Sequence, residues 1–160
     1  MDTYCPRYND YWEELRHALF RGTTIRMLVI DPDCPNARYR AEEIDKDDHY
    51  PYEKFKAEIE AFTMELIRSL RDLEAVLGTP RCEIRVYGDL PCIPMYIIAR
   101  DQKPVRGYSS FFLNKATAYF RHIEWGQGED SLLKNMHRYF EMKWDNVVAK
   151  PDHGGRVVYP

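Results

Sequence analysis

The chain has 160 residues, of which 44% are hydrophobic and 31% are charged, and its formal net charge at pH 7 is −3. This composition is ordinary for a folded domain and excludes an intrinsically disordered chain. Because the net charge is small and negative, the chain has no overall attraction for nucleic acid or for an anionic membrane, so we expect neither as a partner.

The first predicted elements are a helix and a strand. Apolar residues recur at helical spacing over residues 10–21 and stop at Gly22, which predicts a helix. Residues 23–30 (TTIRMLVI) form a short apolar run, which predicts a strand buried on both faces. The N-terminal segment MDTYCP is polar, and no stretch of about 18 apolar residues occurs, so we expect neither a secretory signal nor a membrane helix.

The clearest periodic pattern covers residues 51–77. Its apolar residues are spaced by three or four and predict a long helix: Phe55, Ile59, Phe62, Leu66, Leu70, Leu73 and Leu77. Pro51 suits the first turn of this helix, and Gly78 suits its end. Charged residues dominate positions 40–48 before it, which predicts a solvated connection.

The rest of the chain predicts strands, a helix and a tail. We predict strands at residues 82–87, 94–99, 105–113 and 118–125. A helix is predicted over residues 131–147, with a stripe formed by Leu132, Leu133, Met136, Tyr139, Phe140, Lys143, Trp144 and Val147. Residues 150–160 contain proline and glycine and predict a tail that frays or packs as an extended arm.

The order of these elements predicts the fold class. A strand, a long helix and a second strand form a parallel unit, and the later strands extend its sheet. We therefore expect an α/β fold with a mixed, mainly parallel sheet flanked by helices. It forms a single domain over residues 1–149, followed by a C-terminal tail over residues 150–160.

The cysteines and histidines show no metal-binding spacing. The cysteines at positions 5, 34, 82 and 92 include no C-x-x-C pair, and the histidines form no H-x-x-x-H pattern. We therefore expect no metal and no cofactor. Reduced thiols are the expectation for a cytoplasmic protein. Cys34 and Cys92 lie beside prolines in predicted loops, where exposed thiols would be candidates for reactivity.

Two carboxylates follow the first predicted strand. Asp31 and Asp33 stand where ligands gather in parallel α/β sheets, at the carboxyl end of a strand. Paired carboxylates there would hold a metal or act as acid and base. Asp-Pro-Asp is also a common turn sequence, in which aspartate side chains accept hydrogen bonds from nearby amides. We favour the turn.

Arginines and tyrosines offer a second candidate site. Arg38 and Arg40 follow the first strand closely, and Tyr87 and Tyr108 belong to later strands. Arginine grips phosphate or carboxylate through two parallel hydrogen bonds, so these residues would form an anion or nucleotide pocket if they converge. The alternative is that the arginines pair with surface carboxylates. Further arginines lie on or beside predicted strands, and the same alternative applies to them: Arg26, Arg81, Arg85, Arg100 and Arg106.

Four stretches between Glu13 and Val147 carry a family resemblance. They are EELRHALFRGTTIRMLVIDPDCPNARYRAEEID, the long helix, EIRVYGDLPCIPMYIIARDQKPVRGYSSFFLN, and LLKNMHRYFEMKWDNV. Together they resemble phospholipase D-like domains, in particular the degenerate bacterial ones attached to sensor, regulatory and defence proteins. The shared pattern is a helix ending in Arg-Gly, a strand running into Asp-Pro, a Tyr-x-x-x-Pro turn, and a final helix with Phe-x-x-x-Trp.

The resemblance implies a domain without the family's nucleophile. Active members carry His-x-Lys-x-x-x-x-Asp, and their histidine forms a covalent intermediate. With the aspartate placed on Asp101, Pro94 stands at the histidine and Tyr96 at the lysine. Neither residue forms a phosphohistidine, so the resemblance implies a pseudoenzyme with no catalytic residues. The family's Gly-Ser-x-Asn falls, in altered spacing, on Gly107, Ser109 or Ser110, and Asn114.

Three hypotheses follow. The first, which we favour, is a cytoplasmic, non-catalytic phospholipase D-like sensor in a regulatory or antiviral-defence context. It would bind a nucleotide-like or other anionic ligand through Asp31, Asp33, Arg38, Arg40, Tyr87, Asp89, Tyr108, Ser109, Ser110 and Asn114. The second is a protein-interaction or homodimerisation module, whose face would use aromatic residues beyond those of the core. The third is an atypical phosphodiesterase or nuclease that uses Asp31, Asp33, Asp89 or His122.

Overall fold

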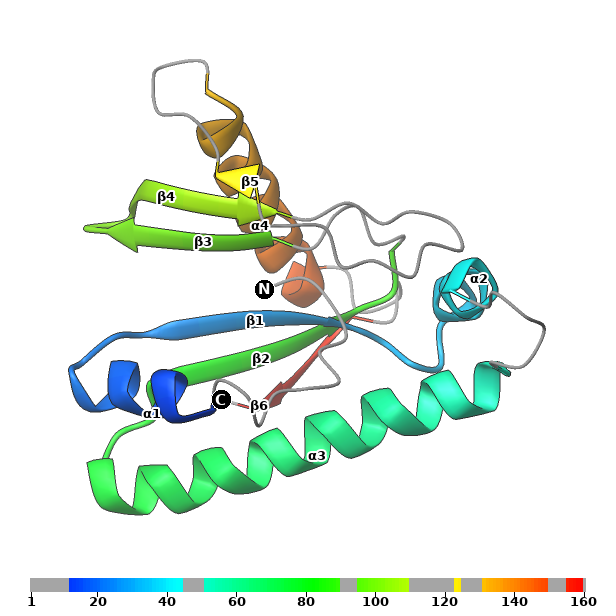
Figure 1. Cartoon of the computed structure of the whole chain (residues 1–160), viewed down its shortest axis with the longest axis horizontal. Helices are drawn as coiled ribbons and strands as arrows, with labels where there is room; N and C mark the ends of the chain where they lie inside the picture. The colour runs from blue at the N-terminus through cyan, green and yellow to red at the C-terminus, as the bar shows by residue number, and fades with distance from the viewer. Residues whose placement is uncertain are drawn as a thin grey trace.

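The computed structural model describes residues 12–44, 51–89, 95–109, 123–124, 131–149 and 155–159. Within these ranges the chain forms helices and strands in the order α1 (Trp12–Phe20), β1 (Ile25–Ile30), α2 (Pro35–Ile44), α3 (Tyr52–Leu77), β2 (Cys82–Tyr87), β3 (Met95–Arg100), β4 (Lys103–Ser109), β5 (Ile123–Glu124), α4 (Leu132–Ala149) and β6 (Arg156–Tyr159) (Figure 1). The predicted strand at residues 118–125 lies outside the described residues except for β5.

The described strands form two small sheets. One sheet has the order β1-β2-β6, and the other has the order β3-β4-β5. β1 and β2 are parallel and in register from Ile25 opposite Cys82 to Ile30 opposite Tyr87. The pairings β2–β6, β3–β4 and β4–β5 are antiparallel. The mixed α/β class is confirmed, whereas a mainly parallel sheet is not, because β1–β2 is the only parallel pairing among the described strands.

A two-residue turn explains why the second sheet is antiparallel. Asp101 and Gln102 join β3 to β4, and their φ angles are 50° and 62°. Two positive φ angles in a two-residue loop match the right-handed twist of a hairpin and reverse the chain directly. Asp101, which the family resemblance aligns with a catalytic aspartate, is exposed at this turn. Figure 1 places the turn at the opposite end of the molecule from α2.

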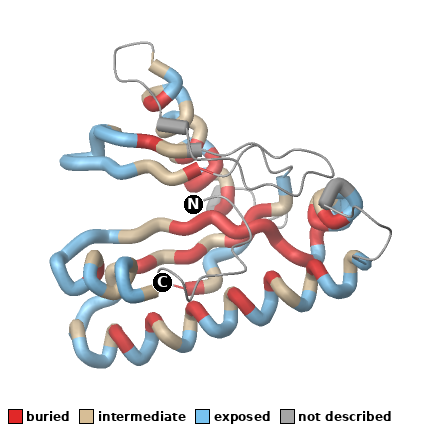
Figure 2. The backbone as a smooth tube through the Cα atoms, viewed as in Figure 1, coloured by how far each residue is buried: buried red, intermediate tan, exposed pale blue. Residues whose placement is uncertain are grey.

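Helices cover both faces of the β1-β2-β6 sheet. The stripe predicted for residues 51–77 is buried from Phe55 to Leu73 on α3, and Gly78 ends the helix with a φ of 73°. Side chains of α1 and α3 meet Cys82 of β2 on one face. On the other face α4 contacts β2 through Trp144. Figure 2 shows buried residues along β1, along β2 and on one side of α3.

α2 corrects a prediction. Residues 40–48 were expected to form a solvated connection, but residues 35–44 form a helix that begins at Pro35. The side chains that α2 buries are small: Ala37 is 0% exposed and Ala41 is 1% exposed. Two alanines give almost no apolar periodicity, so the remaining charged residues dominate the sequence pattern. Residues 45–50 lie outside the described residues.

The end of the chain contributes to the sheet. Residues 156–159, expected to be part of a tail, form β6 and pair antiparallel with β2, with a shift of register between Ile84 and Arg85. Tyr159 is buried in the same core cluster as the α3 stripe. Among the described helices, none is long and apolar enough to cross a membrane.

Candidate functional site

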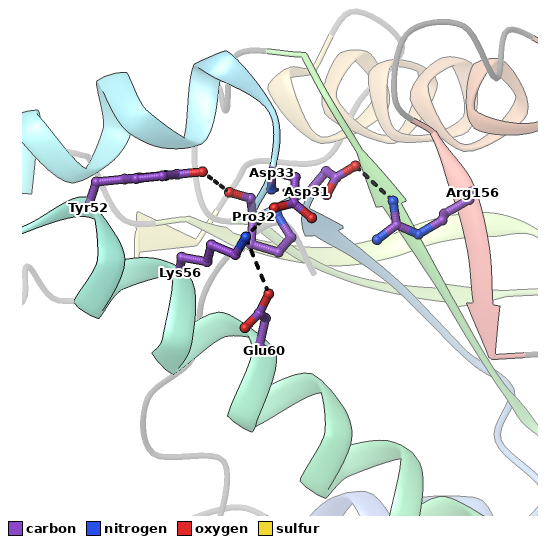
Figure 3. Close-up of polar contacts among 7 residues, drawn as sticks. All are labelled: Asp31, Pro32, Asp33, Tyr52, Lys56, Glu60 and Arg156. Carbon is purple, nitrogen blue, oxygen red and sulfur yellow. Dashed lines mark hydrogen bonds and ion pairs between the residues drawn. The ribbon is translucent and has the colours of Figure 1, made fainter.

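Asp31 lies buried at the carboxyl end of β1. Its N–H donates to the carbonyl oxygen of Tyr87 (2.8 Å), which extends the β1–β2 ladder by one residue. Its side chain is 6% exposed, and its Oδ2 accepts a hydrogen bond from Nη1 of Arg156 on β6 (3.0 Å; Figure 3). Its Oδ1 lies 3.2 Å from the N–H of Asp33, which donates to it. Asp31 therefore forms the turn that the sequence favours and, in addition, an ion pair.

Asp33 points to a different partner. Its carboxylate accepts a hydrogen bond from Lys56 of α3, whose Nζ is also 3.8 Å from Glu60. The same lysine lowers the pKa of Asp33 below its ordinary value. Tyr52 fixes the loop between the two aspartates, because its hydroxyl donates to the carbonyl oxygen of Pro32 (2.5 Å; Figure 3).

The two aspartates therefore do not form one acid–base pair. Arg156 holds the carboxylate of Asp31, and Lys56 holds that of Asp33. Within the described ranges, no cluster of three or more His, Cys, Asp or Glu side chains is placed to hold a metal ion. Both carboxylates tie the β1–α2 loop to neighbouring elements.

The predicted arginines do not converge into a pocket. The guanidinium of Arg38 lies 4.9 Å from the ring centroid of Tyr52, a cation–π contact between α2 and α3. Arg40 lies one half-turn further along α2. On the face of the β1-β2-β6 sheet that α4 covers, Arg26 donates two hydrogen bonds to Glu141. The bond from Nη1 is 2.8 Å long.

Arg26 and Arg85 instead hold α4 on the sheet. Arg85 lies 4.0 Å from the ring centroid of Trp144 and donates to the carbonyl oxygen of the same residue (2.6 Å). Arg26 lies 5.2 Å from the ring centroids of both Trp144 and Phe140. The polar face of β1 and β2 is thus covered by arginine–aromatic packing, so these two arginines are structural.

A cavity lies beside the Asp31 turn, at the end of β2. Its volume is about 100 Å³, room for several water molecules or one small oxyanion. The end of β2, α4 and the start of β6 contribute its lining: Tyr87, Gly88, Asp89, Lys143, Asn146, Val147 and Gly155. It therefore combines residues that are far apart in the sequence.

Lys143 is the distinctive group in this cavity. The residue is 5% exposed, and its Nζ lies 3.9 Å from the ring centroid of Tyr87 and 5.3 Å from that of Tyr139. The faces of both rings stabilise the ammonium group. Lys143 therefore brings a buried positive charge to the lining of a water-accessible cavity.

Close packing fixes the walls of the cavity. Asn36 of α2 donates from Nδ2 to the carbonyl oxygen of Gly88 (2.6 Å), which anchors the chain after β2. A Cβ at Gly155 would lie 2.9 Å from both Cα and O of Val147, so only glycine lets β6 approach α4 this closely. The cavity is thus part of the packed fold.

The structure brings together two of the predicted site residues, Tyr87 and Asp89, at the cavity. Tyr108 and Ser109 lie on β4 opposite Tyr96 and Met95 of β3, and Tyr108 is not among the described lining residues. Ser110, Asn114 and His122 lie outside the described residues. The sequence did not identify the other lining residues, which are Gly88, Lys143, Asn146, Val147 and Gly155. Lys143 alone left a signal, because it is a lysine within an apolar helical stripe.

The described cysteines are buried. Cys34 and Cys82 are free thiols, and burial raises the pKa of both, that of Cys82 to about 12. Cys34 is 8% exposed, so it is not the exposed thiol that its predicted loop position suggested. Cys92 lies outside the described residues.

In comparisons with protein-family models, with curated proteins and with solved structures, the chain matches none significantly. The resemblance to phospholipase D-like domains is therefore still a prediction from the sequence alone.

Proposed function

We propose that the chain is a non-catalytic binding module for a small anionic ligand, held in the cavity at the end of β2. The observation that carries this proposal is the buried ammonium group of Lys143, which lines a cavity of about 100 Å³. An anion that enters would replace water beside this cation in a partly enclosed cavity, where charge attraction is stronger than in bulk water.

The size of the cavity supports an anionic head group as the bound part. It suits one phosphate or carboxylate group, and the remainder of a larger ligand would extend outward past exposed Asp89. A nucleotide-like ligand fits this description through its terminal phosphate. If the phospholipase D-like resemblance holds, the module keeps a phosphate-sized site after losing the catalytic histidine and would serve a bacterial sensor or defence protein.

Neither alternative hypothesis gains a specific observation. Of the residues that the enzyme hypothesis names, Asp31 and Asp33 are each ion-paired, Asp89 lines the cavity, and His122 lies outside the described residues. The homodimer hypothesis needs one apolar face. Within the described ranges, the exposed large hydrophobic residues lie on separate elements: Phe20, Tyr39, Met64, Val76, Ile98, Val105, Leu132, Met142 and Val157.

Thermal unfolding in the presence of inorganic phosphate and of nucleotides tests the proposal. A ligand that binds only the folded state stabilises it by about 2.7 kcal/mol at a concentration about 100 times its Kd. We expect Lys143→Met to abolish the stabilisation, because methionine keeps the apolar stem and removes the charge. Lys103→Met, at an exposed position on β4, is the matched control and should behave like the wild type.

Backbone NMR gives a second readout. Anion binding should shift the amide signals of Gly88 and Gly155, which line the cavity, and leave those of the β3–β4 turn unchanged. If no anion stabilises the wild-type protein, or if Lys143→Met folds and binds as well as the wild type, the proposed function is wrong.

A further inference from the structure

The cavity contains an acidic residue beside its cationic one. Among the described lining residues, Asp89 carries a negative charge and Lys143 a positive one, so their formal charges cancel. A simple anion trap would gain nothing from a carboxylate at this place. The presence of Asp89 therefore bears on which class of anion the cavity accepts.

Resting on the proposed function, we propose that Asp89 makes the cavity selective for an oxyanion that carries a proton. Hydrogen phosphate and phosphate monoesters belong to this class, and sulfate does not. The two side chains have different roles, because Lys143 from α4 attracts the negative charge and Asp89 after β2 recognises the proton.

The selectivity follows from the donor and acceptor capacity of each group. An ionised carboxylate only accepts hydrogen bonds. A phosphate monoester has a second pKa of about 6, so near neutral pH part of it keeps a hydroxyl that donates to the carboxylate in a short, charge-assisted bond. Sulfate has no hydroxyl to donate, and its charge would repel the carboxylate of Asp89.

Close packing fixes the wall of the cavity that α4 and Gly155 form. Lys143 is 5% exposed, and its Nζ lies over the Tyr87 and Tyr139 rings. Val147 lies one helical turn after Lys143 and touches Gly155, so the wall formed by β6 has no space to retreat toward α4. A ligand that lacks the matching donor leaves the Asp89 carboxylate without that hydrogen bond, so it binds more weakly than a protonated oxyanion.

Isothermal titration of the full chain with inorganic phosphate and with sulfate, at about pH 6, tests the inference. We expect the wild type to bind phosphate at least about tenfold more tightly than sulfate. Asp89→Asn keeps the shape of the side chain, removes its charge and adds an N–H donor. This variant should bind the two anions within about twofold of each other, mainly because sulfate binding improves.

Asp72→Asn is the matched control, because it removes the same charge from an exposed position on α3. It should keep the wild-type preference for phosphate. If wild type binds both anions equally and Asp89→Asn changes neither affinity, the inference about Asp89 is wrong while the proposed function stands. If neither anion binds wild type at any accessible concentration, the proposed function itself fails.

Discussion

Single residues at the carboxyl edge of the β1–β2 pair sort into two groups. Asp31 and Asp33 have cationic partners, and their hydrogen bonds hold the β1–α2 loop. Lys143 and Asp89 line a water-accessible cavity on the side of the sheet that α4 covers. Both groups carry opposite charges in proximity, but only the second encloses space for a ligand. The presence of a cavity therefore distinguishes the candidate binding site from the structural ion pairs.

Glu141, which pairs with Arg26, predicts how the free energy of unfolding depends on pH. The hydrogen bond from Arg26 lowers the pKa of Glu141 in the folded state, and His137 lies 3.2 Å from the same carboxylate. The unfolded state therefore binds the proton more readily. The stabilisation is fully present above the unfolded pKa, about 4.3 for glutamate, and is lost as the pH falls through the lower folded pKa.

Glu141→Gln removes this contribution. We expect the difference in unfolding free energy between wild type and variant to be constant near neutral pH and to shrink below about pH 4. Denaturant unfolding at a series of pH values measures it. Glu65→Gln, at an exposed position on α3, is the control and should show a smaller pH-dependent difference. A wild-type advantage that persisted unchanged to the lowest pH would contradict the assignment.

At the scale of elements, helices with a long apolar periodicity could be predicted from the sequence. A short helix that buries only small residues could not. α3 and α4 each repeat apolar residues over several turns, so the sequence located both within a few residues. α2 was missed because its buried positions are alanines. The mainly parallel sheet was expected because a strand, helix and strand do form a parallel pair, but the pairing of β6 depends on contacts that no local pattern records.

The candidate site was predictable only in part, for a related reason. Tyr87 and Asp89 were found because they end a strand, a place where ligands gather. The remaining lining residues come from α4 and β6, which the sequence alone does not place beside β2. Lys143 interrupts an apolar stripe, and an interrupted stripe is as typical of a solvated edge as of a site. Three-dimensional contact distinguishes the two.

β6 gives a prediction at the element scale. Gly155→Ala would place a Cβ 2.9 Å from backbone atoms of Val147, so β6 or α4 must shift. Overpacking of this kind costs about 1–3 kcal/mol of unfolding free energy. We also expect weaker anion binding, because the same residue forms a wall of the cavity.

Chemical denaturation and phosphate titration measure the two effects of Gly155→Ala separately. Val157→Ala, at an exposed position on β6, the strand that follows Gly155, should change stability by no more than about 0.5 kcal/mol and leave binding unaltered. A Gly155→Ala protein with wild-type stability and wild-type binding would show that the close approach of β6 to α4 has no consequence.

At the scale of the whole molecule, one hydrophobic cluster joins elements from both faces of the β1-β2-β6 sheet. It contains buried side chains of α1, β1 and α3 as well as Trp144 of α4 and Tyr159 of β6. Met95 of β3 belongs to the same cluster, so the second sheet contributes to it too. A shared core means that local damage is felt by all of these elements, and it predicts cooperative unfolding.

Leu66 and Met64 on α3 provide a matched test of this shared core. Leu66 is 1% exposed and Met64 is 65% exposed, although they lie two residues apart on one helix. Leu66→Ala should cost about 2–5 kcal/mol, because it removes buried surface and leaves a cavity, whereas Met64→Ala should cost no more than about 0.5 kcal/mol. Two spectroscopic probes then test cooperativity. Far-UV circular dichroism follows the helices, and tryptophan fluorescence includes Trp144 on the opposite face of the sheet.

We expect both probes to give the same, lowered denaturation midpoint for Leu66→Ala. Midpoints that separate would mean that α3 and α4 unfold independently and that no common core connects them.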